Sequence, residues 1–252
     1  MTVISVILFL VLVAVSFLGG RLARLLPEEQ LSADSKDAVK LVMGLIATMT
    51  AVLLGLLITS AKTTYDTAES EVMQMAAKVA LLDRVLKLYG SEAAEARHAL
   101  QDAVADGIRR TWPSRRSAPV RLDSNQQFGD AVYMAIHRLL PQDETQRALK
   151  TQATTLMLQL AELRALLQAQ ALPSVSKPLL LALVSWLVVI FFGFSLVVPA
   201  NATSTLALVA GAFSVACAMF LILELDHPFA GVLRIPSDPM TNTLNHLAKE
   251  TT

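Results

Sequence analysis

Long runs without a charged residue constrain this chain more than any other feature of its sequence. Residues 1–20 and 41–61 contain no Asp, Glu, Lys or Arg, and neither does the longer stretch 178–223. About 20 apolar residues cross a bilayer as a helix, so this stretch holds two spans, divided at Pro199–Thr203. A buried core helix is the alternative for each run, but core helices seldom continue so far without charge. We predict transmembrane helices at about 2–20, 41–61, 178–198 and 203–223.

The charged residues are concentrated in the rest of the chain. Only 17% of the 252 residues are charged and 54% are hydrophobic, whereas soluble chains average about 25% charged residues. Lys and Arg number 21 and so do Asp and Glu, so no basic excess points to nucleic acid as a partner. The single cysteine, Cys217, excludes an intramolecular disulfide and a cysteine metal cluster. This pattern is typical of a protein in a lipid bilayer with an attached domain.

The first apolar run is predicted to be a retained span and not a signal peptide. No Lys or Arg precedes it, and Phe17 and Leu18 stand where a cleavage site carries small residues. The chain then divides into two spans within 1–61, a domain at 62–177, two spans within 178–223 and a tail at 224–252. The predicted fold class is an all-α membrane protein with a helical, coiled-coil-like domain between the second and third spans.

Two apolar stripes define the helices of that domain. Their residues recur in steps of three and four, the spacing of a coiled-coil seam. The first stripe follows span two: Tyr65, Ala68, Val72, Met75, Val79, Leu82, Leu86 and Tyr89. The second precedes span three: Leu149, Ala153, Leu156, Leu160, Leu163 and Leu167. The stripes are expected to pack antiparallel on each other, or alternatively against another subunit.

Further helices are predicted from Ser91 to Trp112 and from Phe128 to Leu140. Residues 113–125 between them, with Arg115, Arg116 and Arg121, are predicted to form a loop. This basic loop is either simply solvated or in contact with acidic lipid headgroups.

Four spans place both termini and the domain on the same side of the membrane. Lys and Arg near the span ends normally decide which side is cytoplasmic, but here their numbers are similar on both sides. Arg21 and Arg24, directly after span one, favour placing the loop between the first two spans inside.

Small residues line one face of span two and one face of span four. In both spans the small residues recur at steps of three and four. Those of span two are Gly44, Thr48, Ala51, Gly55 and Thr59. Those of span four are Ala207, Gly211, Ser214 and Ala218. Small faces let helices approach closely in lipid, so both are predicted to be packing faces. The alternative for span two is that this face lines a narrow path in an oligomer.

The segment after span four carries two carboxylates at a helix end that is already negative. Glu224 and Asp226 are unfavourable there unless they are paired or cap a turn. Asp226 is expected to cap the turn at Pro228, or both carboxylates hold a cation or an arginine such as Arg234. Beyond this turn, Met240, Leu244 and Leu247 predict a short amphipathic tail helix that starts at Asp238-Pro239.

No residue pattern indicates catalysis or a cofactor. The four histidines, His98, His137, His227 and His246, lack metal-ligand spacing, and no nucleophile elbow or phosphate-binding glycine loop is present. The predicted spans also lack the acidic or basic residue that a proton-coupled transporter normally needs. A channel with an apolar wall, gated by constriction or dewetting, needs no such charge. We therefore expect no enzyme, no metal and no cofactor.

The chain resembles a bacterial family of membrane proteins labelled bestrophin-like, whose function is unknown. The likeness is carried by these segments: Leu31–Asp37, Gly44–Thr48, Leu54–Leu57, Leu82–Leu86, Tyr89-Gly90, Asn201–Thr203 and Leu223–Gly231. The last includes Glu224, Asp226, Pro228, Phe229 and Gly231. Together these segments are specific to the family, and the likeness runs nearly from one end of the chain to the other.

A weaker likeness leads to true bestrophins, which are pentameric anion channels with span two at the pore and a cytoplasmic helical domain. Pro228-Phe229 is similar to the pair before their acidic calcium site, but Val232–Ile235 follows here. Span two contains no Phe, so their aromatic pore neck is missing. The likeness to bestrophins therefore implies neither calcium control nor anion selectivity for this chain.

The resemblance implies a homo-oligomeric ion channel of the bacterial inner membrane, with a pentamer as one form. Span two would lie nearest the pore, inorganic ions would pass through it, and the domain would be cytoplasmic. The alternative is a non-conducting scaffold or sensor whose helical domain uses its stripes to bind a protein partner.

Overall fold

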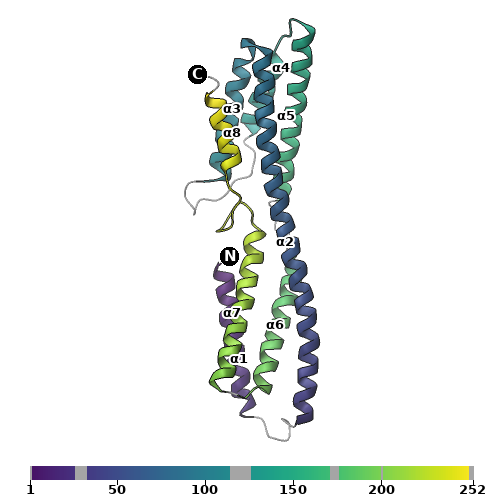
Figure 1. The fold of residues 1–252 in the computed structure, drawn as a ribbon, viewed down its shortest axis with the longest axis vertical. Helices are drawn as coiled ribbons and strands as arrows, with labels where there is room; N and C mark the ends of the chain where they lie inside the picture. The colour runs from purple at the N-terminus through teal and green to yellow at the C-terminus, as the bar shows by residue number, and fades with distance from the viewer. Residues whose placement is uncertain (1, 26–32, 114–125, 171–175, 200, 250–252) are drawn as a thin grey trace. The chain divides into compact units, whose positions relative to one another are not determined.

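The computed structural model describes residues 2–25, 33–113, 126–170, 176–199 and 201–249. These residues form helices joined by short connections (Figure 1). The helices are α1 (Thr2–Ala23), α2 (Ala33–Tyr89), the 3-10 helix η2 (Ser91–Ala93), α3 (Ala94–Thr111), α4 (Gln126–Arg138), α5 (Glu144–Gln170), α6 (Lys177–Val197), α7 (Ala202–Leu225) and α8 (Asp238–Lys249). The predicted all-α fold is confirmed for this part of the chain. The basic loop predicted at 113–125 lies outside it, apart from Pro113.

Among the helices that the structure describes, four are long and apolar enough to cross a membrane: α1, α2, α6 and α7. They contain the four predicted spans, so the chain is a multi-pass membrane protein. The second span is one part of α2, which has 57 residues and continues through Lys62 without a break. Its end at Tyr89 has a local cause, because Gly90 has φ 119°, a backbone conformation that suits glycine. Pro178 stands in the first turn of α6, and the Asn201 side chain accepts a hydrogen bond from the Ser204 backbone N–H (2.8 Å) at the start of α7.

The described residues divide into two compact units, each with its own apolar core. The first unit covers residues 1–63 and 173–226, and the second covers 64–172 and 227–252. The predicted tail at 224–252 is therefore divided: Glu224–Asp226 belong to the first unit, and the rest belongs to the second. The division passes through α2 and falls directly after Asp226.

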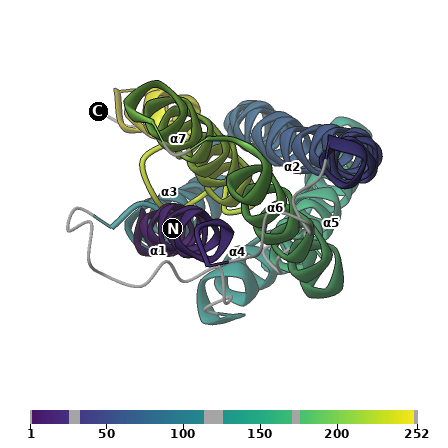
Figure 2. The same ribbon diagram turned by 90° about the horizontal axis from the view of Figure 1, so that it is seen from below.

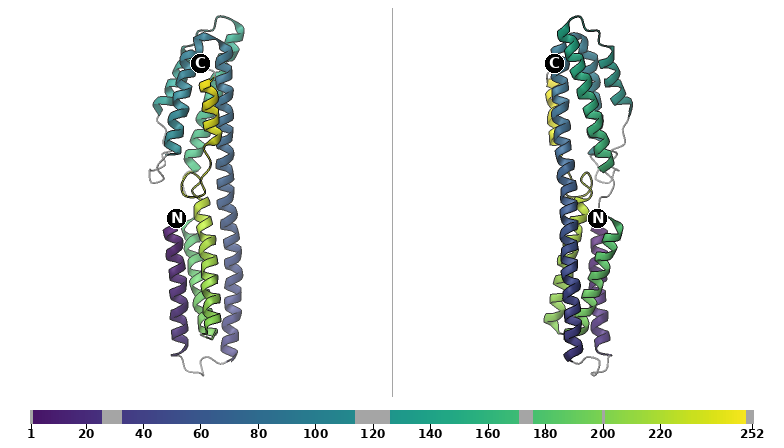
Figure 3. Two further views of the ribbon diagram at one scale, coloured as in Figure 1. Left: turned by 60° about the vertical axis from the view of Figure 1, so that its left-hand side comes forward. Right: turned by 90° about the vertical axis from the view of Figure 1, so that its right-hand side faces the viewer.

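In the first unit, α1 packs against α6 and α7, and the first part of α2 runs in the same general direction as this group (Figure 3). Viewed from below, α1, α6 and α7 gather in one group (Figure 2). Glycines permit the closest approaches. A methyl group at Gly19 of α1 would overlap the Ser195 hydroxyl of α6, and one at Gly193 of α6 would overlap the Met43 sulfur of α2. Neither glycine belongs to the small-residue faces predicted for spans two and four.

The second unit is built around the part of α2 from Thr64 onward and around α5. Both apolar stripes contribute to its core: Val72, Val79, Leu82 and Leu86 from α2, and Ala153, Leu156, Leu160 and Leu167 from α5. Two hydrogen bonds fix the direction of the pair. The Lys78 ammonium donates to the Gln159 side-chain oxygen (2.7 Å), and the Gln146 amide donates to the Tyr89 carbonyl (3.1 Å). The C-terminal end of α2 thus meets the N-terminal end of α5, and the helices are antiparallel.

The C-terminal segment is held on α3 within the second unit. The Trp112 indole donates to the Ile235 carbonyl (2.8 Å), and its ring meets Phe229 edge to face at 6.0 Å between centroids. The Gln101 amide donates to the Leu247 carbonyl of α8 (3.0 Å). The predicted tail helix therefore exists, and two of its three predicted apolar residues, Met240 and Leu247, are buried.

Candidate functional site

The small-residue face of α2 lies on the outside of the chain. Its five residues are all exposed: Gly44, Thr48, Ala51, Gly55 and Thr59. Apart from the neighbouring residues of α2 itself, a methyl group added at Gly44 or Gly55 would meet no described atom within 4 Å. Within the described residues, no other helix of the chain packs on this face.

The opposite face of α2 holds the helix in its own unit. Met43, Thr50 and Leu57 are buried and recur every seven residues, which keeps them on one side of the helix. The small residues lie roughly half a turn away from them. A third face, with Leu45, Met49, Val52 and Leu56, is also exposed and carries large apolar side chains. Span two therefore presents one inward face and two outward faces, of which one is small and one is bulky.

The hydroxyl groups of both threonines on the small face donate hydrogen bonds to backbone carbonyls of their own helix. The Thr48 hydroxyl donates to the Gly44 carbonyl and the Thr59 hydroxyl donates to the Gly55 carbonyl, both at 2.9 Å. Such bonds leave no unpaired donor in an apolar surrounding. In this rotamer each hydroxyl oxygen retains a free lone pair and presents an acceptor on the outer face.

The four residues of the small face of α7 differ in their exposure. Ala207 and Ser214 are exposed, whereas Gly211 and Ala218 are half-buried. Gly211 lies beside the Phe191 ring of α6, since a methyl group there would stand 3.6 Å from the Phe191 Cζ atom. Contact of the α2 and α7 small faces with other copies of the chain stays a prediction.

The segment after span four is divided between the two units. In the first, the Glu224 and Asp226 side chains are buried, at 2% and 4% exposure, and the Asp226 backbone N–H ends α7 with a bond to the Ile222 carbonyl (3.0 Å). In the second, the Pro228 carbonyl accepts from the Ile235 N–H (2.8 Å), and Gly231 has φ 90° in the turn that this bond closes.

Among the described residues, no group of three or more His, Cys, Asp or Glu side chains could hold a metal ion. Glu224, in the last turn of α7, and Asp226, which caps that helix, belong to no such group. Their interpretation as a cation site or an arginine pair stays a prediction. Arg234 belongs to the second unit and is exposed.

Comparison with known proteins gives one match. A family model described as a bestrophin-like domain covers residues 10–240, which is nearly the whole chain. It spans all of the faces and segments described above except the first residues of α1 and most of α8. No curated protein and no solved structure gives a significant match.

Proposed function

The chain belongs to the bestrophin-like family, and we propose that it is the subunit of a homo-oligomeric ion channel with α2 nearest the pore. The observation that carries the proposal is the outward, uncovered small face of α2. In lipid, association of helices depends on close van der Waals contact, which small side chains allow. A face of Gly, Ala and Thr gains little from lipid tails and more from another helix or a narrow aqueous path.

The chemistry of this face suits conduction without a fixed charge. Residues 41–61 contain no ionisable side chain, and the polar side-chain atoms of the small face are the hydroxyl oxygens of Thr48 and Thr59. A pore with such a wall can be gated by constriction or dewetting. The residues of the face do not decide between anions and cations, so both belong in the experiment.

The rival function, a scaffold that binds a partner through its stripes, loses its main support. The stripe residues of α2 and α5 are used in the core of the second unit. A partner could reach them only by opening that core. We therefore retain the channel as the function that the structure supports best.

We place the protein in the bacterial inner membrane, with the second unit on the cytoplasmic side. The family likeness supports both statements. The exposed, apolar surfaces of α1, α2, α6 and α7 require lipid around the first unit.

The experiment is reconstitution of the purified chain in liposomes, with flux measured for anions and for cations and the oligomeric state measured in parallel. Gly55→Leu should abolish flux or dissociate the oligomer, because it places a bulky side chain on the small face. It should not disturb the single chain, since the space at Gly55 is open.

Met49→Phe is the matched control, because Met49 is exposed on the bulky face, about 120° around the helix from Gly55, and the change also enlarges its side chain. It should conduct as the unaltered protein does. A chain that oligomerises but passes no anion or cation would refute the proposal. Equal flux through Gly55→Leu and Met49→Phe would refute the assignment of α2 to the pore.

A further inference from the structure

The ends of α1, α6 and α7 meet at one edge of the first unit and form a groove of about 320 Å³ (Figure 1). The uncharged run of α1 ends at Gly20, α6 ends at Val197 and α7 begins at Ala202. Because each of these helices is long and apolar enough to cross a bilayer, their common edge lies near the boundary between hydrocarbon and water. The described lining includes no residue of α2, so the groove is separate from the face to which conduction is assigned.

The lining of this groove changes from polar to apolar along the spans. At the edge it carries Arg21 and Arg24 of α1 and the hydroxyl-bearing Ser204 of α7. Further into the same two helices the lining is apolar: Val13, Phe17, Leu208 and Val209. Phe17 is 51% exposed, so this part of the groove opens onto the outer surface of the spans. Such a gradient matches a molecule with an anionic head and an apolar chain.

The polar groups at the edge are available to a ligand. Arg21 and Arg24 are three residues apart and so lie on one side of α1. Neither guanidinium has an ion pair or a hydrogen bond with any residue that the structure describes, and the Ser204 hydroxyl also has no such partner. The backbone N–H of Ser204 is used differently, since it bonds the Asn201 side chain (2.8 Å). The edge thus holds two positive charges that no described carboxylate compensates.

The deeper hydroxyls of the groove are already used by their own helices. The Ser16 hydroxyl donates to the Leu12 carbonyl (2.8 Å), and the Ser195 hydroxyl donates to the Phe192 carbonyl (2.7 Å). The donors that remain for a ligand are therefore concentrated at the edge, beside the arginines.

We propose that this groove binds the headgroup of an anionic phospholipid, such as phosphatidylglycerol. The phosphodiester accepts charge-assisted hydrogen bonds from the Arg21 and Arg24 guanidinium groups and a hydrogen bond from the Ser204 hydroxyl. The first part of an acyl chain lies against the apolar lining, and the rest leaves through the open side into the bilayer. Basic pockets between transmembrane helices are known to hold anionic headgroups in this way.

The charge of the lipid decides the preference. A zwitterionic phospholipid such as phosphatidylcholine carries its own cation beside the phosphate, so the two arginines gain less from it. A lipid that binds only the folded first unit also stabilises it by mass action. The proposal does not depend on whether the protein conducts ions.

Binding can be measured on the full-length, delipidated protein in detergent by native mass spectrometry. The probes are dioleoylphosphatidylglycerol and dioleoylphosphatidylcholine, offered together at equal concentration. The first lipid retained on each chain should be phosphatidylglycerol by about fivefold or more, because only this lipid brings a net negative charge to the arginines. Arg21→Gln combined with Arg24→Gln should bring the ratio of the two lipids close to one. Equal retention by the unaltered protein, or an unaltered preference in this variant, would overturn the proposal.

Lys36→Gln combined with Lys40→Gln is the matched control, because it removes the same amount of positive charge. Both lysines lie in the first turns of α2, Lys40 pairs with Asp37 (2.8 Å), and neither lysine lines the groove. This variant should retain the preference for phosphatidylglycerol. A loss as large as that of the arginine variant would show that the preference follows net charge and not the groove, which would contradict the proposal.

A further variant fills the groove without changing its charge. Gly20 lines the groove, and a methyl group there would meet nothing within 4 Å. Gly20→Leu should lower the retention of phosphatidylglycerol to that of phosphatidylcholine while the unfolding temperature stays the same. A stable Gly20→Leu protein that retains phosphatidylglycerol normally would show that the lipid does not occupy this groove.

A soluble phosphodiester is the other source of the same chemistry. Glycerophosphoglycerol carries the headgroup of phosphatidylglycerol without its acyl chains. At about a tenfold excess it should leave the lipid bound, because it buries no methylene groups against the apolar lining. Displacement of the lipid at this excess would assign the groove to a soluble anion and overturn the lipid assignment.

Discussion

Gly19 and Gly20 are neighbours in α1, yet only the first permits a close helix contact. A methyl group at Gly19 would overlap the Ser195 hydroxyl and lie 3.1 Å from the Phe192 carbonyl oxygen, whereas one at Gly20 would meet nothing within 4 Å. The pair marked the end of an apolar run in the sequence. Its packing role depends on which side of α1 faces α6, and an apolar sequence does not encode that side.

Gly19→Leu should therefore destabilise the first unit, and Gly20→Leu should not. Overpacking of a tight contact typically costs about 1–3 kcal/mol. Thermal unfolding in detergent, followed by loss of helical circular dichroism, should show a lower midpoint for Gly19→Leu. Equal midpoints for the two variants would contradict the packing of α1 on α6.

Tyr89 is the residue through which alkaline pH should act on the second unit. Its side chain is buried, and its hydroxyl has no hydrogen-bond partner among the described residues. Burial raises the pKa of Tyr89 above its ordinary value of 10.0, and the negative charges of Glu92 and Asp143 raise this pKa further. The folded protein therefore retains the phenolic proton at a pH at which the unfolded chain releases it.

The sign of the effect follows from proton linkage. Below the unfolded pKa both states are protonated, and the stability from Tyr89 is fully present. It is lost as pH rises from about 10 through the raised folded pKa, because the unfolded chain binds fewer protons there. Tyr89→Phe should remove this part of the alkaline loss. Denaturant unfolding of both proteins across this pH range measures it, and identical pH profiles would contradict the prediction.

At the scale of the elements, most helices follow from sequence patterns. The predicted spans lie within α1, α2, α6 and α7, because runs of this length without charge belong in a bilayer. The stripes of α2 and α5 were visible because apolar and polar residues alternate periodically where a helix meets water. Inside the spans every face is apolar, so periodicity disappears. That is why the contacts of Gly19 and Gly193 were missed, although the composition of the α2 small face was recognised.

The tail helix α8 should be an integral part of the second unit. Leu247 is 2% exposed, and its carbonyl accepts the bond from Gln101. Leu247→Ala should cost about 2–4 kcal/mol, as truncation of a buried leucine usually does. The neighbouring exposed residue provides the control, His246→Ala, which should change stability little. Denaturant unfolding followed by Trp112 and Trp186 fluorescence measures both, and equal midpoints would argue against docking of α8.

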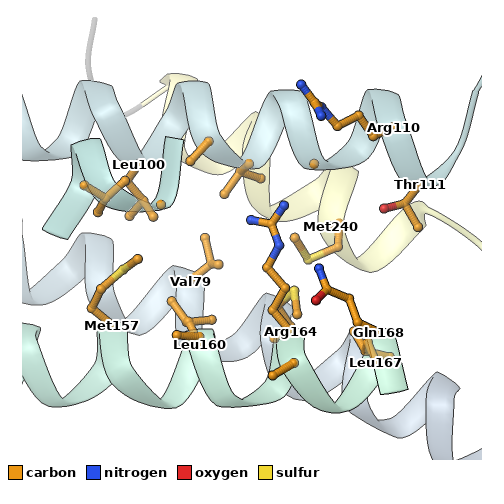
Figure 4. Close-up of a pocket in the computed structure, with 18 of the residues that line it drawn as sticks. Val79, Leu100, Arg110, Thr111, Met157, Leu160, Arg164, Leu167, Gln168 and Met240 are labelled. Carbon is orange, nitrogen blue, oxygen red and sulfur yellow. The ribbon is translucent and has the colours of Figure 1, made fainter. Parts of the chain in front are cut away.

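At the scale of the whole molecule, a cavity shows what a sequence does not reveal (Figure 4). This cavity of about 410 Å³ lies in the second unit, and its lining comes from α2, α3, α4 and α5 together with Trp112, Phe229 and Met240, which no short motif joins. Arg164 carried no signal in the sequence, because a charged residue on a long helix usually faces water. Only the packing of α2, α3, α4 and α5 places it in an apolar space. A local pattern can indicate a face of one helix, as it did for α2, but not a site assembled from several helices.

The side of the membrane can be tested by cysteine labelling in intact cells. In a Cys217→Ser background, Asp34→Cys at the start of α2 should react with an impermeant thiol reagent added outside. Gln142→Cys, exposed between α4 and α5, should react only after the cells are permeabilised. This follows from the cytoplasmic placement of the second unit together with the span of α2. The reverse labelling pattern would place the second unit outside.

The most direct test of the channel is modification of single cysteines in the span of α2 while flux is measured in liposomes. Thr48→Cys on the small face and Met49→Cys on the bulky face, each in the Cys217→Ser background, are neighbours in sequence but point about 100° apart around the helix. A charged, water-soluble thiol reagent should lower ion flux several-fold through Thr48→Cys and leave flux through Met49→Cys unchanged. An equal response of the two variants, or no flux of any ion before modification, would contradict this prediction.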